Sequence, residues 1–112
     1  MWAVRELTAV ELLGHAPWTL AREYCQLTRK KWPKVNARLL SSPSIASDKL
    51  YFVTEHKSLA DAEQWDKIFW TDEEVQQLLK RQRELDKENG GRSIYSPYRD
   101  LFVYDVSEEE RR

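Results

Sequence analysis

Residues 49–62, KLYFVTEHKSLADA, decide how this chain folds. The first part, 49–56, combines β-branched and aromatic side chains in a way that is typical of a strand. Ser58 then starts a helix, and Asp61 three residues later completes a variant of the capping box, which satisfies free amides of the first helical turn. The stretch therefore predicts a strand that is followed at once by a helix.

The helix that begins at Ser58 is predicted to be divided. Its apolar stripe recurs at three- and four-residue steps and consists of Leu59, Ala62, Trp65 and Phe69. A second cap signature, TDEE over 71–74, indicates that the helix breaks near Trp70 and restarts. The restarted helix is expected to end at 89–91, NGG, because glycine readily adopts the left-handed conformation that terminates helices.

The remaining elements lie on either side of this segment. Strands are expected over 2–7, 35–40, 92–96 and 100–106, with Pro97 between the last two, and an amphipathic helix runs from Pro17 to Pro33. The order is β-α-β-β-α-β with an extra β segment at the end. This is the ferredoxin-like arrangement, an α+β fold with two helices on one face of an antiparallel sheet. We expect one ferredoxin-like domain over 1–106 and a charged C-terminal tail over 107–112.

Composition argues against several functional classes. The 112 residues include 18 Lys and Arg against 19 Asp and Glu, and this balance argues against general attraction to nucleic acid. The single cysteine, Cys25, excludes an internal disulfide and a Cys-based zinc site. No apolar run approaches the roughly 20 residues that a membrane span needs. We expect a soluble, cytoplasmic protein without metal or other cofactor, and with neither nucleic acid nor membrane as a partner.

An RNA-recognition domain shares this order of elements and is the rival interpretation. Its third strand places small residues beside the aromatic residues that stack on bases. Residues 49–55 lack those small residues and end in Glu55, which would repel phosphate. The strand pattern therefore disfavours RNA binding.

The strands carry large apolar side chains on both faces. Successive strand residues point to opposite faces, and both parities are apolar in 50–53 and in 101–104. Helices cover only one face, and an apolar patch beyond roughly a few hundred Å2 is typical of a binding surface. We predict that the uncovered face packs against a second copy about a two-fold axis, with Val53, Phe102 and Tyr104 at the interface. The alternative is an ordinary exposed sheet with scattered aromatic residues.

Residues 51–62, YFVTEHKSLADA, together with the break at 71–73, resemble the dimeric α/β-barrel superfamily, which holds antibiotic-biosynthesis-type monooxygenases. The resemblance implies two ferredoxin-like subunits that pack their sheets face to face. It also implies a cofactor-independent, monooxygenase-like enzyme that acts on an aromatic or polyketide-like small molecule. This chain departs from the family at Trp65, which stands where monooxygenase members often have a histidine. The Asn and His of haem-degrading members are missing from the first strand and from 72–88.

Several side chains are candidates for a site between the sheet and the helices. The predicted aromatic lining for a flat apolar or aromatic ligand is Tyr51, Trp65, Phe69 and Tyr95. The catalytic candidates are His56 as a proton carrier, Glu55 and Arg5, although Glu55 and His56 fall on opposite strand faces. The alternatives are core packing, or a non-catalytic ligand-binding or assembly protein on the same scaffold. A pocket that holds Arg5, Glu55 or His56 beside Trp65 would favour the enzyme.

Overall fold

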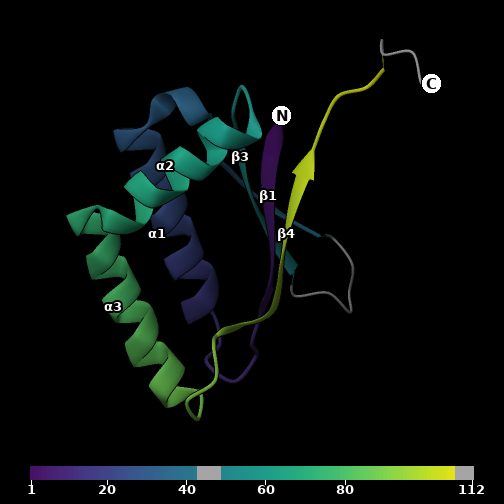
Figure 1. Cartoon of the computed structure of the whole chain (residues 1–112). Helices are drawn as coiled ribbons and strands as arrows, with labels where there is room; N and C mark the ends of the chain where they lie inside the picture. Colours follow the sequence, from purple (N-terminus) through teal and green to yellow (C-terminus); the bar gives the residue numbers. More distant parts are fainter. Residues whose placement is uncertain (43–48, 108–112) are drawn as a thin grey trace.

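Alternating strand-forming and amphipathic segments give a β-α-β-β-α-α-β order (Figure 1). The structure is a computed structural model that describes residues 1–42 and 49–107. The strands are β1 (Trp2–Ala9), β2 (Arg38–Ser41), β3 (Lys49–Glu55) and β4 (Tyr95–Val103). The helices are α1 (Ala16–Lys31), α2 (Leu59–Thr71) and α3 (Glu73–Glu88), with a short 3-10 helix, η1 (Pro33–Val35). In the described part of the chain, no helix is both long and apolar enough to cross a membrane.

The four strands form one antiparallel sheet in the order β2-β3-β1-β4. All three helices lie on the same side of this sheet (Figure 1). The predicted α+β class is confirmed, and both the order of the strands and the placement of the helices are compatible with a ferredoxin-like fold. Among the described strands, β2 and β4 are the outer ones, and each has one edge without a neighbouring strand.

Strands β1 and β3 end within two residues of their predicted bounds, whereas β2 and β4 differ more. The segments expected over 92–96 and 100–106 form the single strand β4, whose register against β1 shifts by one residue between Leu7 and Ala9. Pro97 is tolerated because such a bulge on an edge strand needs no amide there. Strand β2 begins later than predicted because residues 33–35 form η1 and Asn36 then turns the chain with φ of 46°. Of the predicted tail 107–112, residues 108–112 lie outside the described residues.

The two predicted helix starts and the break between them are confirmed. The Ser58 hydroxyl accepts a hydrogen bond from the Asp61 amide at 3.2 Å. Asp72 stands between α2 and α3, and its carboxylate accepts from the Glu74 and Val75 amides at 3.1 and 3.2 Å. Helix α3 also ends as predicted, and Gly90 just beyond it has a φ of 71°.

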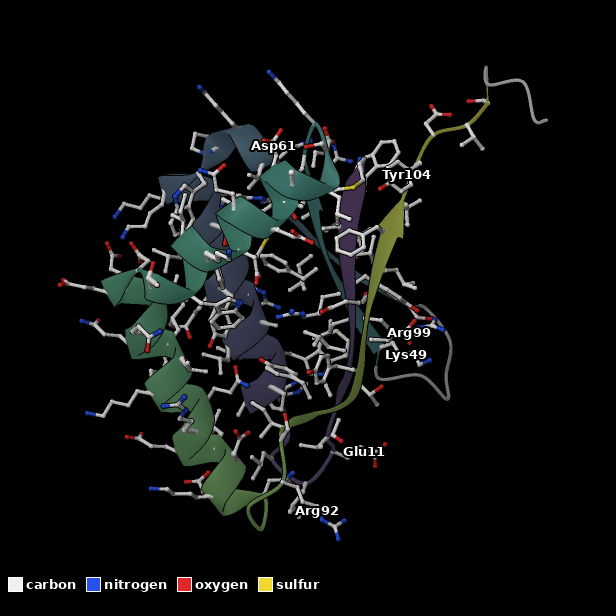
Figure 2. The ribbon with its side chains drawn as sticks, in the orientation of Figure 1. Glu11, Lys49, Asp61, Arg92, Arg99 and Tyr104 are labelled. Carbon is white, nitrogen blue, oxygen red and sulfur yellow. The ribbon has the colours of Figure 1, made fainter. Side chains whose placement is uncertain are left out.

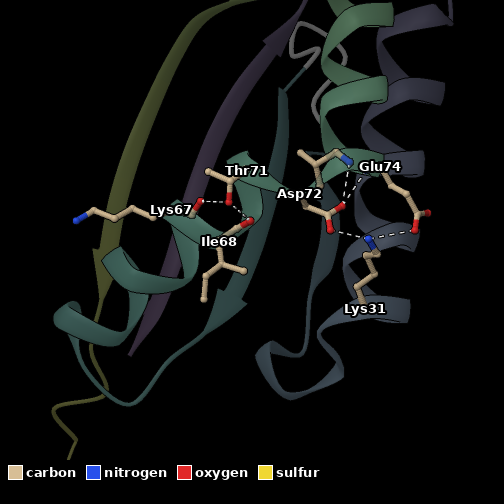
Figure 3. Close-up of polar contacts among 7 residues, drawn as sticks. Lys31, Lys67, Ile68, Thr71, Asp72 and Glu74 are labelled. Carbon is tan, nitrogen blue, oxygen red and sulfur yellow. Dashed lines mark hydrogen bonds and ion pairs between the residues drawn. The ribbon is translucent and has the colours of Figure 1, made fainter.

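An ion pair ties the α2–α3 junction to the end of α1 (Figure 3). Lys31 Nζ lies 2.6 Å from Asp72 Oδ1 and 3.1 Å from Glu74 Oε1. The hydrogen bond from Lys31 lowers the pKa of Asp72, and the two carboxylates raise the pKa of Lys31. These contacts therefore attach the junction of α2 and α3 to the C-terminal end of α1.

The core lies between the sheet and the three helices. Its buried residues are Ala9, Leu20, Ala21, Tyr24, Leu50, Phe69, Val75, Ile94 and Tyr95. Cys25 is also buried on α1, and burial raises the pKa of its thiol, so it stays protonated and unreactive. The amphipathic stripes found in the sequence are therefore mainly packing surfaces.

Candidate ligand-binding cleft

A cleft of about 550 Å3 separates α2 from the helix-facing side of the sheet. Side chains from α2 and from the strands extend into this space (Figure 2). Most exposed residues of its lining belong to two elements: Glu63, Asp66 and Lys67 of α2, and Tyr98, Asp100, Leu101 and Phe102 of β4. The cleft therefore opens between α2 and the edge strand β4.

One wall of the cleft is a contiguous set of aromatic rings on α2. The ring centroids of Trp65 and Phe69 are 5.1 Å apart, and those of Phe69 and Trp70 are 4.9 Å apart in an edge-to-face arrangement. Trp32, from the end of α1, packs edge-to-face on Trp65 at 6.0 Å. Such contacts hold the rings in place, so the wall is formed before any ligand arrives.

The floor of the cleft carries a charged pair. Arg5 of β1 donates from Nε to Asp100 Oδ1 at 2.7 Å and from Nη2 to Asp100 Oδ2 at 3.0 Å. The same guanidinium lies 5.8 Å from the ring centroids of both Trp70 and Tyr98. Its hydrogen bonds to Asp100 raise the pKa of Arg5, so this side chain remains charged.

His56 stands at the end of β3, beside the aromatic wall. Its Nε2 lies 2.8 Å from the buried Thr54 hydroxyl, and its ring centroid is 5.4 Å from that of Trp65. Burial lowers its pKa from the usual 6.5 and outweighs the nearby carboxylate of Asp61, which acts in the opposite sense. The imidazole is therefore neutral at pH 7 and able to accept a proton.

Trp65, which lines the cleft, carries a buried polar group. Its indole Nε1 is buried and has no hydrogen-bond acceptor among the described residues. A buried donor without an acceptor costs about 1–3 kcal/mol. An oxygen atom of a ligand or a water that reached this N–H would offset that cost.

The cleft brings together five of the residues that the sequence singled out. They are Arg5, His56, Trp65, Phe69 and Tyr95. Tyr95 is mostly within the core, and its hydroxyl donates to the Pro17 carbonyl at 2.6 Å. Tyr51 and Glu55 instead belong to the opposite face of the sheet, since they alternate with Phe52 and Thr54 of the lining. Glu55 accepts a hydrogen bond from Asn36 Nδ2 at 2.9 Å, and this contact lowers its pKa.

The lining residues that were missed from the sequence include Tyr98 and Asp100 of β4. Period-two alternation along β4 would have placed both on the face of Phe102. Dividing this strand at Pro97 concealed that relation. The partnership of Asp100 with Arg5 depends on a pairing register that no local pattern reveals.

The uncovered face of the sheet contains only one of the three predicted interface residues. Val53 pairs with Val4, whereas Phe102 pairs with Ala3, and these neighbours point to opposite faces. Phe102 therefore faces the cleft, and Tyr104 follows the end of β4 with 55% of its surface exposed. A single flat interface does not contain both Val53 and Phe102.

Charged groups on the uncovered face pair with one another. Glu6 lies 3.3 Å from both Lys49 Nζ and Arg99 Nη2, from the two strands that flank β1. Lys49 and Arg99 are on the side of the strands away from the helices (Figure 2). The rest of this face mixes apolar and charged side chains: Trp2, Val4, Leu40, Tyr51, Val53, Leu101 and Val103 lie beside Arg38 and Glu55.

Comparisons with protein-family models, with curated proteins and with solved structures found no match to this chain. Within residues 1–42 and 49–107, no group of three or more His, Cys, Asp or Glu side chains is arranged to hold a metal ion.

Proposed function

We propose that this protein binds a planar aromatic or polyketide-like small molecule in the cleft and acts on it as a cofactor-independent, monooxygenase-like enzyme. The observation that carries the proposal is the aromatic cleft that holds Arg5 and a neutral His56 beside Trp65. Its volume of about 550 Å3 lies within the range of small-molecule sites. Flat rings would stack against the wall formed by Trp65, Phe69 and Trp70.

In the proposed reaction His56 acts as the general base. It takes a proton from an enolic or phenolic ligand, and the resulting electron-rich anion reacts with molecular oxygen. For a ring methylene that becomes a carbonyl, one oxygen atom enters the product. The other leaves as water with the two hydrogens of the methylene, and the substrate supplies all four electrons that reduce the dioxygen.

A second candidate function is ligand binding without catalysis. Arg5 is the cation nearest the floor of the cleft, and its charge is already matched by Asp100. A substrate anion would gain little stabilisation from a cation in that state. This pairing favours a carrier or assembly protein over an oxygenase.

We also propose that a second copy of this chain covers the uncovered face and forms a homodimer. Apolar residues of this face, including Val4 and Val53, lie beside the ion pairs that Glu6 makes with Lys49 and Arg99. An identical surface would bury the charges of Glu6, Lys49 and Arg99 as pairs, and Arg38 and Glu55 of the same face would need partners in the interface. A face-to-face pair of sheets is the arrangement of a dimeric α/β barrel.

The two candidate functions are separated by measuring binding and oxygen uptake on the same protein. Titration with 1-naphthol should quench tryptophan fluorescence, and an oxygen electrode should record uptake with anthrone above the uncatalysed rate. His56→Asn should abolish the enzymatic uptake. The matched control is His15→Asn, because His15 is the other histidine, is exposed and lies outside the cleft lining.

Each outcome decides between the proposals. Quenching with uptake that depends on His56 supports the enzyme, whereas quenching without uptake supports the binding protein. Absence of quenching would contradict both, since each needs a ligand against Trp65 and Trp70.

A further inference from the structure

The cation on the floor of the cleft is held from several sides at once. Asp100 occupies two N–H donors of Arg5 in a two-point hydrogen bond of 2.7 and 3.0 Å. The rings of Trp70, from α2, and Tyr98, from β4, each lie 5.8 Å from the guanidinium carbon. These contacts fix the direction of the guanidinium and leave its charge matched by a carboxylate of the protein.

The other charges in the lining are mainly negative. Glu63 and Asp66 of α2 contribute carboxylates, and Lys67 contributes an ammonium group. Asp66 is close enough to Arg5 to raise the pKa of the guanidinium, and it also accepts a hydrogen bond from Trp70 Nε1 at 3.1 Å. With His56 neutral, three carboxylates in the lining face two cations.

We infer that Asp100 is a specificity-determining residue: by occupying Arg5, it makes the cleft select uncharged planar ligands and reject carboxylates of the same shape. This inference rests on the proposed binding function and names the class of ligand that the cleft takes. It assigns Arg5 and Asp100 to ligand selection and gives them no role in proton transfer.

The selection follows from the cost of bringing a second anion to this floor. An incoming carboxylate would have to compete with Asp100 for Arg5, or lie beside Asp66 and Asp100 with the exposed Lys67 as the other cation of the lining. Either course removes a charge from water without an adequate partner. An uncharged phenol or ketone meets no such cost, so discrimination arises from a repulsive element as well as from the aromatic wall.

The test compares two probes of nearly the same shape at neutral pH, the uncharged 1-naphthol and the anionic 1-naphthoate. For the wild-type protein we expect 1-naphthol to bind at least about ten-fold more tightly, by tryptophan quenching and by calorimetry. Asp100→Asn keeps the size of the side chain and frees the guanidinium. We expect this variant to shift the ratio of the two affinities toward 1-naphthoate by at least about ten-fold.

The double variant Arg5→Gln, Asp100→Asn is the matched control, because it lacks the freed cation and should lose the gain for 1-naphthoate. The wild-type preference is a separate test that needs no variant to fold. Equal or tighter binding of 1-naphthoate to the wild type would overturn the inference, as would an unchanged ratio in a folded Asp100→Asn. If the wild type binds neither probe, the binding function fails and this inference with it. If it binds both without preference, only the inference fails.

Discussion

Arg5 and Asp100 are direct register partners across β1 and β4, and their side chains meet in a two-point ion pair on the floor of the cleft. The pair joins residues that are 95 positions apart in the chain. It therefore links the edge strand to the centre of the sheet at the place where a ligand would enter.

This pair should make a small but measurable contribution to folding. Its side chains are 34% and 45% exposed, so solvent screens much of the attraction. A double-mutant cycle with Arg5→Ala and Asp100→Ala, measured by urea unfolding, should give a coupling energy of about 0.5–1 kcal/mol. A coupling near zero would mean that the pair acts on ligand selection alone.

The helix junction predicts a dependence of stability on acidity. The pKa of Asp72 is lowered below its usual 3.8 in the folded protein, first by the hydrogen bond from Lys31. The unfolded chain then binds more protons as the pH falls. The stabilisation is fully present well above pH 3.8 and is lost as the pH falls through the folded pKa. The melting temperature should decline over this range.

Two substitutions of Asp72 separate the contribution of its ion pair to stability from the contribution of its helix cap. Asp72→Asn keeps a good cap and should remove only the acid-dependent part of the stability. Asp72→Ala should also lose the cap bonds to Glu74 and Val75, at a further cost of about 1 kcal/mol. Equal melting temperatures for the two variants would contradict a capping role.

A carboxylate introduced by substitution on one face of the sheet or on the other tests the proposed dimer. Val53→Glu would bury an unpaired carboxylate and should give a monomer or an unstable protein by light scattering and melting. Phe102→Glu is the control, because Phe102 faces the cleft. It should leave the subunit count unchanged and weaken 1-naphthol binding. A dimer that tolerates Val53→Glu would place the interface elsewhere.

The role proposed for His56 predicts how the rate of the reaction falls at low pH. Because burial lowers the pKa of this imidazole below 6.5, the proton acceptor is present at neutral pH and is lost only on further acidification. Anthrone-dependent oxygen uptake should therefore fall with a midpoint below pH 6.5. A midpoint at or above pH 6.5 would mean that a group other than His56 controls the fall in rate.

Local signals in the sequence were sufficient for the helices and for most strands. Ser58 and Asp72 cap helices through atoms a few residues away, and Gly90 ends α3 through its own backbone. The placement of Glu55 and His56 on opposite faces of the sheet likewise follows from the alternation of side chains along a strand. These features depend on neighbours in the chain, so the sequence contains them directly.

Tertiary structure decided which apolar parity faces the helices and which residues meet in the cleft. Strand β3 is apolar on both sides, since Phe52 lines the cleft and Val53 lies on the uncovered face, and periodicity alone does not distinguish them. The meeting of Arg5 with Asp100, and of His56 with Trp65, depends on strand register and on the angle of α2. Both are set by packing between distant segments, because the free energy that selects them arises only when those segments come together.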